Sequence, residues 1–215
     1  MSYGRSHGKA APLSVSQNFL TGTRTIRRML DLTDIGSGDL VYEIGPGKGH
    51  ITRQLLSRCG SLRAAELDPA LCKKLLEAFA DSPGFTLYQG DFLSMPLPPS
   101  GAYKVFSNIP FSRTTEIVRK LTRAQNPPEA AWLVMEAGAA KRFCGTPRET
   151  LFSLSLRPFF QLKTVYRLQK QDFHPAPSVD TVLLAIRRKE QPDLPLNQQA
   201  LYRSFLERAW KQGLR

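Results

Sequence analysis

Short apolar runs that are typical of buried strands alternate with segments of helical periodicity along most of this chain. After the run 62–66, for example, Leu71, Leu75, Leu76 and Phe79 recur at helical spacing. The expected strands of this part are 40–44, 62–66, 85–88, 103–107 and 131–135. Strands that alternate with helices in this way form a parallel sheet with helices on both faces, so we expect an α/β fold.

The C-terminal part departs from this alternation. Two β-rich runs, 159–168 and 181–188, have no long helix between them, which predicts an antiparallel hairpin at one edge of the sheet. Helices are expected at 24–32 and, in a basic segment, at 197–211. We divide the chain into a basic flexible tail at 1–13, one main domain at 14–190 and a short helical C-terminal segment at 191–215.

Charge is distributed unevenly along the sequence. The 215 residues include 30 Lys and Arg but only 18 Asp and Glu, which gives a net charge of +12. Residues 1–30 carry five positive charges and no acid, whereas residues 31–106 carry seven positive and nine negative charges. Basic flanks around a mildly acidic middle indicate that the flanks hold a polyanion such as a nucleic acid. General solubility is the alternative explanation.

Several classes of protein match this composition poorly. No apolar run reaches the roughly 18 residues of a membrane-spanning helix, and the first residues lack the apolar stretch of a signal peptide. The three cysteines form no C-x-x-C pair, which argues against a disulfide scaffold or a zinc ribbon. We expect a cytoplasmic monomer with no bound metal and no membrane contact.

A glycine-rich loop follows the first of these strands. Its sequence, Glu43-Ile-Gly45-Pro-Gly47-Lys-Gly49, lets the backbone approach a ligand at the start of a helix. His50 stands where a dinucleotide fingerprint has its third glycine, and the G-x-x-x-x-G-K-[ST] pattern of a phosphate-binding loop is absent. The loop therefore favours a ligand without a pyrophosphate.

Two acidic residues close the next two strands. Glu66 can accept hydrogen bonds from both hydroxyls of a ribose, and Asp91 can accept one from the amino group of an adenine. A helix cap for Glu66 and an ordinary turn for Asp91 are the alternatives. Because ligands of such sheets bind beyond the carboxyl ends of the strands, the loop and the two acids predict a nucleoside ligand. S-adenosylmethionine is a ligand of this kind.

The tetrapeptide Asn108-Ile109-Pro110-Phe111 is expected at the end of the fourth strand. An exocyclic amine on a base is a poor nucleophile, because its lone pair is delocalised into the ring. Acceptors for its two N–H groups, from the Asn108 side chain and the Ile109 carbonyl, would localise that lone pair toward a methyl donor. Pro110 stiffens the turn, and Phe111 offers a flat face on which a flipped base can stack. A plain loop is the alternative.

Six motifs stand in the order found in the ribosomal RNA adenine-N6 methyltransferases, and the chain resembles this superfamily over about residues 14–190. The motifs are Ser16-Gln-Asn-Phe-Leu20, Glu43-Ile-Gly-Pro-Gly-Lys-Gly49, Glu66-Leu-Asp68, Gly90-Asp-Phe92, Asn108-Ile-Pro-Phe111 and Phe173-His-Pro-Ala-Pro-Ser-Val-Asp180. The resemblance implies a Rossmann-like class I S-adenosylmethionine-dependent methyltransferase with a mostly parallel seven-stranded sheet. S-adenosylhomocysteine would be its second product.

The resemblance also implies roles for individual residues. The residues implied to bind the cofactor are Gln17, Asn18, Leu20, Gly45, Gly47, Gly49, Glu66, Asp91 and Asn108. Those implied to hold the target base and its amine are Asn108, Ile109, Pro110, Phe111 and Phe173. Phe111 stands where the family usually has a tyrosine, so the ring is kept and the hydroxyl is lost. A core phenylalanine is the alternative for Phe173.

The superfamily joins the Erm enzymes of large-subunit RNA with the KsgA-type dimethylases of small-subunit RNA. The Gly-Lys-Gly of the loop, the Asn-Ile-Pro sequence and the short C-terminal segment are more similar to Erm. That resemblance implies methylation of one adenine in 23S rRNA and resistance to macrolides, lincosamides and streptogramin B. Residues 191–215 would be a reduced or truncated form of the helical C-terminal domain of Erm proteins. A KsgA-type 16S rRNA dimethylase and a non-catalytic RNA-binding or transcription-factor relative are the alternatives.

Basic residues stand near the expected site in three parts of the chain, where they would bind the phosphates of ribosomal RNA. These residues are Arg24, Arg27, Arg28, Arg113, Arg119, Arg123, Lys141 and Arg142. Glu116 and Lys120 are four residues apart on an expected helix, so we expect a surface ion pair between them.

Overall fold

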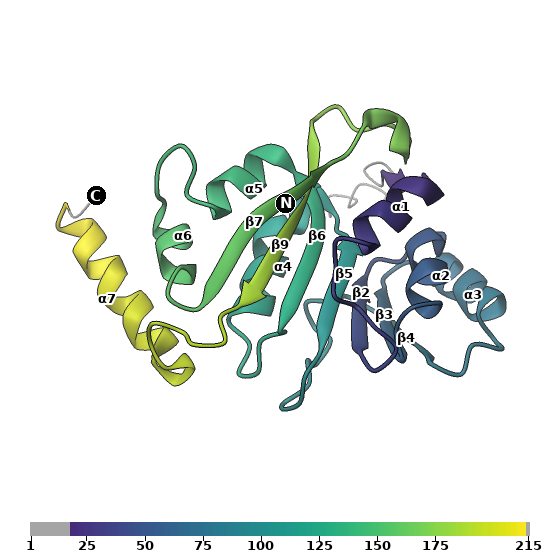
Figure 1. Ribbon diagram of the computed structural model, residues 1–215, viewed down its shortest axis with the longest axis horizontal. Coiled ribbons are helices and arrows are strands. Elements are labelled where there is room, and N and C mark those ends of the chain that lie inside the picture. Colours follow the sequence, from purple (N-terminus) through teal and green to yellow (C-terminus); the bar gives the residue numbers. More distant parts are fainter. Residues whose placement is uncertain (1–17, 214–215) are drawn as a thin grey trace, which may run out of the picture.

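The computed structural model describes residues 18–213, and its centre is a seven-stranded sheet (Figure 1). The strand order is β4-β3-β2-β5-β6-β9-β7, in which β9 is antiparallel to both of its neighbours and the other pairs are parallel. The strands are β2 (Leu40–Ile44), β3 (Ser61–Glu66), β4 (Phe85–Gln89), β5 (Lys104–Asn108), β6 (Ala130–Glu136), β7 (Phe160–Arg167) and β9 (Thr181–Arg188). The predicted parallel sheet with an antiparallel edge hairpin is confirmed.

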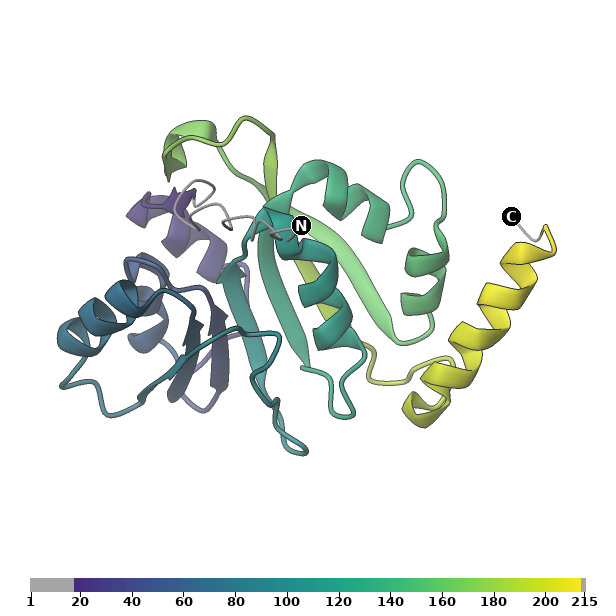
Figure 2. The ribbon, with the colours of Figure 1, turned by 180° about the vertical axis from the view of Figure 1, so that it is seen from behind.

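Helices cover both faces of this sheet (Figures 1 and 2). The α-helices are α1 (Thr23–Leu30), α2 (His50–Leu56), α3 (Pro69–Ala78), α4 (Thr114–Thr122), α5 (Ala137–Phe143), α6 (Leu151–Leu156) and α7 (Gln199–Lys211). Three short 3₁₀ helices are η2 (Phe111–Arg113), η3 (Lys170–Asp172) and η4 (Leu196–Gln198). Among residues 18–213, no helix is both long and apolar enough to cross a membrane.

The two faces of the sheet bury two separate hydrophobic clusters. Successive residues of a strand point to opposite faces, so Val105 and Leu133 pack in one cluster, and Phe106 and Trp132 pack in the other. The first cluster includes buried residues of α4, α5 and α6, and the second includes those of α1 and α2. The strands at the centre of the sheet are therefore apolar on both sides, as the continuous apolar runs predicted.

A small second sheet lies beside the main one and was not predicted. Strand β1 (Phe19–Leu20) pairs antiparallel with β8 (Phe173–His174), with Leu20 opposite Phe173. Both strands are only two residues long, which is too short for a pattern in the sequence to reveal. This pairing joins the start of the described chain to the segment between β7 and β9.

Strands β2 and β5 separate before they end. Their register pairs Val41 with Lys104 and Tyr42 with Val105, and no later pair continues it. Beyond that point the hydroxyl of Ser107 donates to the carbonyl of Ile44 and accepts from the Ile44 amide at 3.2 Å. The chain order reverses here, because β3 and β4 lie on one side of β2 and β5 lies on the other. We call the region beyond the carboxyl ends of the strands at this switch point the crevice, because α/β sheets bind their ligands there.

Ser107→Ala tests whether this hydroxyl holds the two strands together. Ser107 is fully buried, so its removal leaves two backbone groups of Ile44 without this partner. We expect the free energy of unfolding, measured in urea, to fall by about 1–3 kcal/mol. The exposed hydroxyl of Ser204 on α7 provides the control, and Ser204→Ala should change stability by less than about 0.5 kcal/mol. Equal stability of the two variants would contradict the assignment.

Candidate functional site at the carboxyl edge of the sheet

The glycine-rich loop leaves β2 at the crevice and leads into α2. Gly45, Gly47 and Gly49 have φ values of 64°, 58° and 78°, a left-handed conformation that favours glycine. At Gly47 a Cβ atom would lie 2.7 Å from the Phe19 ring, so a side chain there would also displace β1. The glycines thus allow the left-handed backbone of the loop, and the ring of Phe19 packs against one side of it.

Glu66 is buried under this loop at the end of β3, with 3% of its surface exposed. Its Oε2 atom accepts a hydrogen bond from the Gly47 amide at 3.0 Å. Its Oε1 atom accepts from the amides of Leu67 at 2.8 Å and Asp68 at 3.0 Å. Three backbone donors therefore orient the carboxylate that the sequence predicts to bind ribose. The same Asp68 accepts from the first turn of α3, as expected of a helix cap.

Glu43 is a second buried acid of the site, and the sequence analysis gave it no role. It is 2% exposed, and its Oε2 accepts from the Thr52 hydroxyl at 2.7 Å. The pKa of Glu43 is raised to about 8, mainly because burial disfavours the charged form; the hydrogen bond from Thr52 lowers the pKa, and the nearby charge of Glu66 raises it. A glutamate inside an otherwise apolar strand, directly before a glycine loop, is the sequence signal that could have identified it.

Asp91 follows β4, and both of its carboxylate oxygens have partners. Oδ1 accepts from the Leu93 amide at 2.9 Å, and Oδ2 lies 3.4 Å from Nη2 of Arg113. Arg113 also donates to Oε2 of Glu116, from Nη2 at 2.9 Å and from Nε at 3.1 Å. The hydrogen bond to Glu116 is the main cause of the raised pKa of Arg113. This arginine, predicted to bind RNA, is thus engaged by two acids of its own chain.

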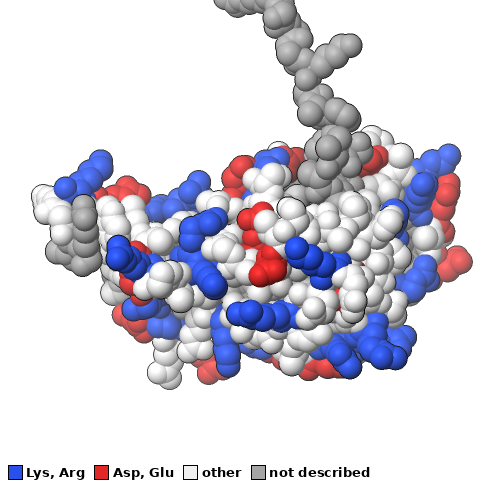
Figure 3. Space-filling model, turned by 90° about the horizontal axis from the view of Figure 1, so that it is seen from above, with Lys and Arg blue, Asp and Glu red and all other residues white. Residues whose placement is uncertain are grey.

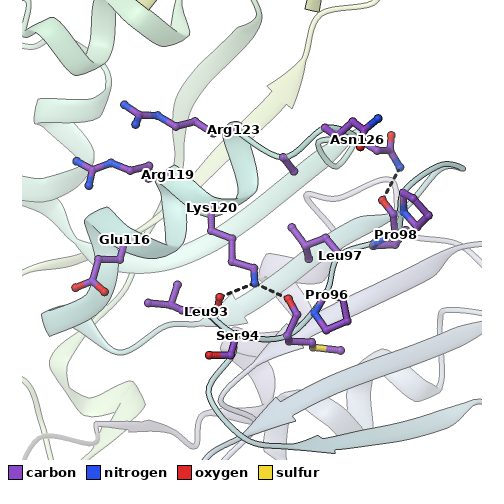
Figure 4. Close-up of a pocket in the computed structure, with 14 residues that line it drawn as sticks. Leu93, Ser94, Pro96, Leu97, Pro98, Glu116, Arg119, Lys120, Arg123 and Asn126 are labelled. Atoms are coloured by element: carbon purple, nitrogen blue, oxygen red, sulfur yellow. Dashed lines mark hydrogen bonds between the residues drawn. The ribbon is translucent and has the colours of Figure 1, made fainter. Parts of the chain in front are cut away.

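The predicted ion pair between Glu116 and Lys120 is wrong. Glu116 pairs with Arg113, and Nζ of Lys120 donates to the carbonyl oxygens of Leu93 at 2.9 Å and Met95 at 2.5 Å. Lys120 lies at the base of a cavity of about 690 Å³ between α4 and the loop 93–99 (Figure 4). Helical spacing could not reveal carbonyl oxygens that a distant loop brings to the lysine.

Asn108 is the last residue of β5, and one of its two side-chain polar atoms has no hydrogen-bond partner among the described residues. Its Nδ2 donates to the carbonyl of Asn18 at 2.8 Å. Its Oδ1 is buried and has no hydrogen-bond partner within residues 18–213. Buried polar atoms are paired in most proteins, so an acceptor left free at the crevice indicates a ligand with a donor group. The next residues are Ile109, which is buried, and Pro110, which is exposed.

The remaining predicted site residues lie in different environments. Phe111 begins η2 and is half-buried. Leu20 and Phe173 are 3% and 4% exposed, and both pack in the cluster of α1 and α2. The side chain of Phe173 therefore lies in the hydrophobic core, as the alternative interpretation expected. Contact between Phe173 and a target base stays a prediction. Gln17 and the tail 1–13 lie outside the described residues.

The basic residues predicted to bind RNA, other than Arg113, are exposed. Arg119 of α4 and Arg123, the C-cap of that helix, lie over the ring of Phe152, with Cζ 6.0 and 5.9 Å from its centroid. Figure 3 shows the carboxyl edge of the sheet from above, where Lys and Arg side chains surround a few acidic ones. The exposed residues are Arg24, Arg27 and Arg28 on α1, Arg119 on α4, Arg123 at the C-cap of α4, and Lys141 and Arg142 on α5.

Together, the fold and the crevice define the class of α/β proteins that bind a nucleoside at a topological switch point. Comparison with known proteins identifies the family. The family model "Ribosomal RNA adenine dimethylase" matches residues 9–213. The chain therefore belongs to the ribosomal RNA adenine dimethylase family. The assignment to S-adenosylmethionine-dependent rRNA adenine-N6 methyltransferases is confirmed at this level.

Two kinds of curated relative match the chain at similar levels. An rRNA adenine N-6-methyltransferase of Staphylococcus aureus is 35% identical over 191 residues, which are 89% of this chain and 77% of the relative. The ribosomal RNA small subunit methyltransferase A of Chlorobaculum parvum is 32% identical over 209 residues, 94% of this chain and 74% of the relative.

Solved structures of similar fold include the 23S rRNA methyltransferase ErmE. It has a TM-score of 0.82 and 28% identity, and the match covers 91% of this chain and 80% of ErmE. A dimethyladenosine transferase from Plasmodium falciparum has a TM-score of 0.72 and 22% identity, with 80% of this chain and 63% of that chain covered. The predicted Rossmann-like methyltransferase fold is confirmed by these similarities.

Glu43→Gln should change how stability depends on pH. The pKa of Glu43 is about 8 in the folded protein and has an ordinary value of 4.5, so between these values the folded state holds a proton that the unfolded chain releases. The free energy of unfolding of the wild type should therefore fall as the pH rises through this window. In the glutamine variant, which has no titrating group at this position, this fall should be absent. Urea unfolding of both proteins at pH 5, 6.5 and 8 measures the difference in their free energies of unfolding. From pH 5 to pH 8 this difference should change in favour of the variant. A difference that is constant with pH would contradict the assignment.

Proposed function

We propose that this chain transfers a methyl group from S-adenosylmethionine to N6 of one adenine in 23S rRNA, and thereby confers resistance to macrolides, lincosamides and streptogramin B. The observation that carries the chemistry is the unpaired Oδ1 of Asn108 at the end of β5. Preference for 23S over 16S rRNA is supported by the similarity to ErmE and by the Gly-Lys-Gly and Asn-Ile-Pro sequences.

The residues of the crevice fit a nucleoside cofactor. The glycine loop leaves space for a ligand beside Gly45, Glu66 is oriented for a ribose, and Asp91 stands at the next strand end for an adenine. When bound, the cofactor supplies an electrophilic methyl group on a sulfonium. The role of these residues is to hold that methyl group in line with the target amine, and positioning of this kind can account for a large part of the rate.

Asn108 and Ile109 act on the target. The free Oδ1 accepts one N–H of the adenine amine, and the Ile109 carbonyl accepts the other, which turns the nitrogen lone pair toward the methyl group. With the cofactor bound, a C–N bond would form as the methyl–sulfur bond broke, and the amine would release one proton to solvent. Phe111, half-buried at the start of η2, stacks on the flipped base, a contact worth about 1–3 kcal/mol.

A 16S rRNA dimethylase is the second candidate, because relatives named ribosomal RNA small subunit methyltransferase A match 94% or more of this chain. Both candidates share the site and differ in the RNA that the basic surface recognises. We further propose that the protein acts as a monomer in the cytoplasm, where ribosomal RNA is made in bacteria.

Methyl transfer to protein-free 23S and 16S rRNA tests the proposal. With labelled S-adenosylmethionine we expect N6-methyladenine in 23S rRNA, which digestion and mass spectrometry would detect. Asn108→Ala should lower the rate by more than 100-fold, since the free acceptor is lost, and should leave the affinity for S-adenosylhomocysteine within about threefold of the wild type. Label in 16S rRNA alone would overturn the assignment to 23S, and a normal rate for the variant would remove Asn108 from the mechanism.

Two arginines should differ in how they affect RNA binding. Arg119 is exposed and has no acidic partner within the described residues, so Arg119→Ala should reduce the slope of log affinity against log salt by about one. Arg113 is engaged by Asp91 and Glu116, so Arg113→Ala should leave that slope unchanged. Filter binding of a 23S rRNA fragment from 50 to 300 mM salt measures both. A reduced slope for Arg113→Ala would restore its role as a phosphate contact.

A further inference from the structure

Asp172, at the end of η3, accepts hydrogen bonds from two parts of the chain that are distant in the sequence. Its carbonyl oxygen accepts from the amides of Thr21 at 2.9 Å and Gly22 at 3.2 Å. Its Oδ1 accepts from the Thr25 hydroxyl at 2.7 Å, and its Oδ2 accepts from the Gln169 amide at 2.8 Å. One carboxylate thus joins the start of α1 to the turn that precedes β8.

The start of α1 depends on this contact. Gly22 is the N-cap of α1 and provides no side-chain cap. Its amide donates to the Asp172 carbonyl, and the Thr25 hydroxyl of the first turn donates to the Asp172 carboxylate. A Cβ atom at Gly22 would lie 3.0 Å from Oδ1 of Asp172, which shows how closely the two segments approach. Together with the pairing of Leu20 and Phe173, these bonds fix the position of β1.

Strand β1 in turn determines which way the Asn108 amide points. The carbonyl of Asn18, directly before β1, accepts from Nδ2 of Asn108 at 2.8 Å. A side-chain amide has a donor end and an acceptor end of nearly equal size, and only its partners decide which end faces a ligand. Because a carbonyl can only accept, Asn18 selects the donor end and leaves Oδ1 free.

We propose that Asp172 is a positioning residue for methyl transfer, which acts through β1 and the Asn18 carbonyl to keep Oδ1 of Asn108 available to the target amine. The proposal rests on the function proposed above for Asn108. Without the Asp172 carboxylate, β1 and the two residues after it keep their backbone bonds to Phe173 and Asp172, but the Thr25 hydroxyl and the Gln169 amide lose their acceptor. The start of α1 can then shift relative to the segment between β7 and β9, the Asn18 carbonyl moves with it, and the amide of Asn108 can rotate. The substrate would then meet a donor where it needs an acceptor.

Asp172→Ala removes both carboxylate contacts, and Thr25→Val removes only the contact from α1. Asp193→Ala is the matched control, because it deletes an exposed carboxylate that pairs with Lys189 on another part of the surface. We expect kcat for rRNA methylation to fall about tenfold in Asp172→Ala and about threefold in Thr25→Val, with KM for RNA within twofold of the wild type. Asp172→Asn, which keeps an acceptor for Thr25, should recover part of the loss. Asp193→Ala should match the wild type.

The side-chain ¹⁵N–¹H₂ signals of Asn108, assigned by their loss in Asn108→Asp, test the same proposal without RNA. We expect these signals to shift and their protons to exchange faster with water in Asp172→Ala and Thr25→Val, but not in Asp193→Ala. Unchanged signals in both variants, or kcat within twofold of the wild type in both, would overturn the proposal. If the wild type methylates no rRNA, the proposed function fails, and the signals alone decide whether Asp172 orients Asn108. If Asp172→Ala does not fold, Thr25→Val decides.

Discussion

The separation of β2 from β5 is the constraint on which the site depends. The two strands stop pairing after Tyr42 and Val105, and the backbone amide and carbonyl of Ile44 form hydrogen bonds with the buried hydroxyl of Ser107 instead. That separation opens the sheet where the chain order reverses, which is where α/β sheets bind ligands. The glycine loop leaves from one side of the opening and Asn108 from the other, so donor and acceptor of the methyl group can meet across it.

The acidic side chains of this opening have hydrogen-bond partners, whereas one buried amide oxygen has none. Glu66 is oriented by three backbone amides, Glu43 by Thr52, and Asp91 by Leu93 and Arg113. Only Oδ1 of Asn108 is buried without a partner among the described residues. The loss of a hydrogen bond at a buried acceptor costs about 1–3 kcal/mol, so the protein carries an unfavourable contact that a bound amine would relieve. In the proposed mechanism, this acceptor is therefore in place before the target amine binds.

The sequence predicted the strands of the main sheet and the residues at their carboxyl ends, because periodicity and turn residues are local signals. Helix α6 was missed because it is only six residues long, although Thr150 and Ser153 form a capping box at its start. The pair β1–β8 was missed because each strand has two residues and its partner is distant in the sequence. Asp91 as a partner of Arg113, and the carbonyl oxygens of Leu93 and Met95 as partners of Lys120, were also not predictable, because residues that follow β4 supply them. Motif residues indicated the chemistry of Asn108, but the carbonyl of Asn18 that orients it has no side-chain signature at all.

The most direct test is a crystal structure of the protein with S-adenosylhomocysteine and adenosine bound together. The account given above predicts the adenine amine within about 3 Å of Oδ1 of Asn108, a normal hydrogen-bond distance, with the ribose of the cofactor on Glu66. It also predicts that Nδ2 of Asn108 keeps its bond to the Asn18 carbonyl. An amide that presents Nδ2 to the adenine, or an adenine bound away from Asn108, would contradict the central role assigned to this residue.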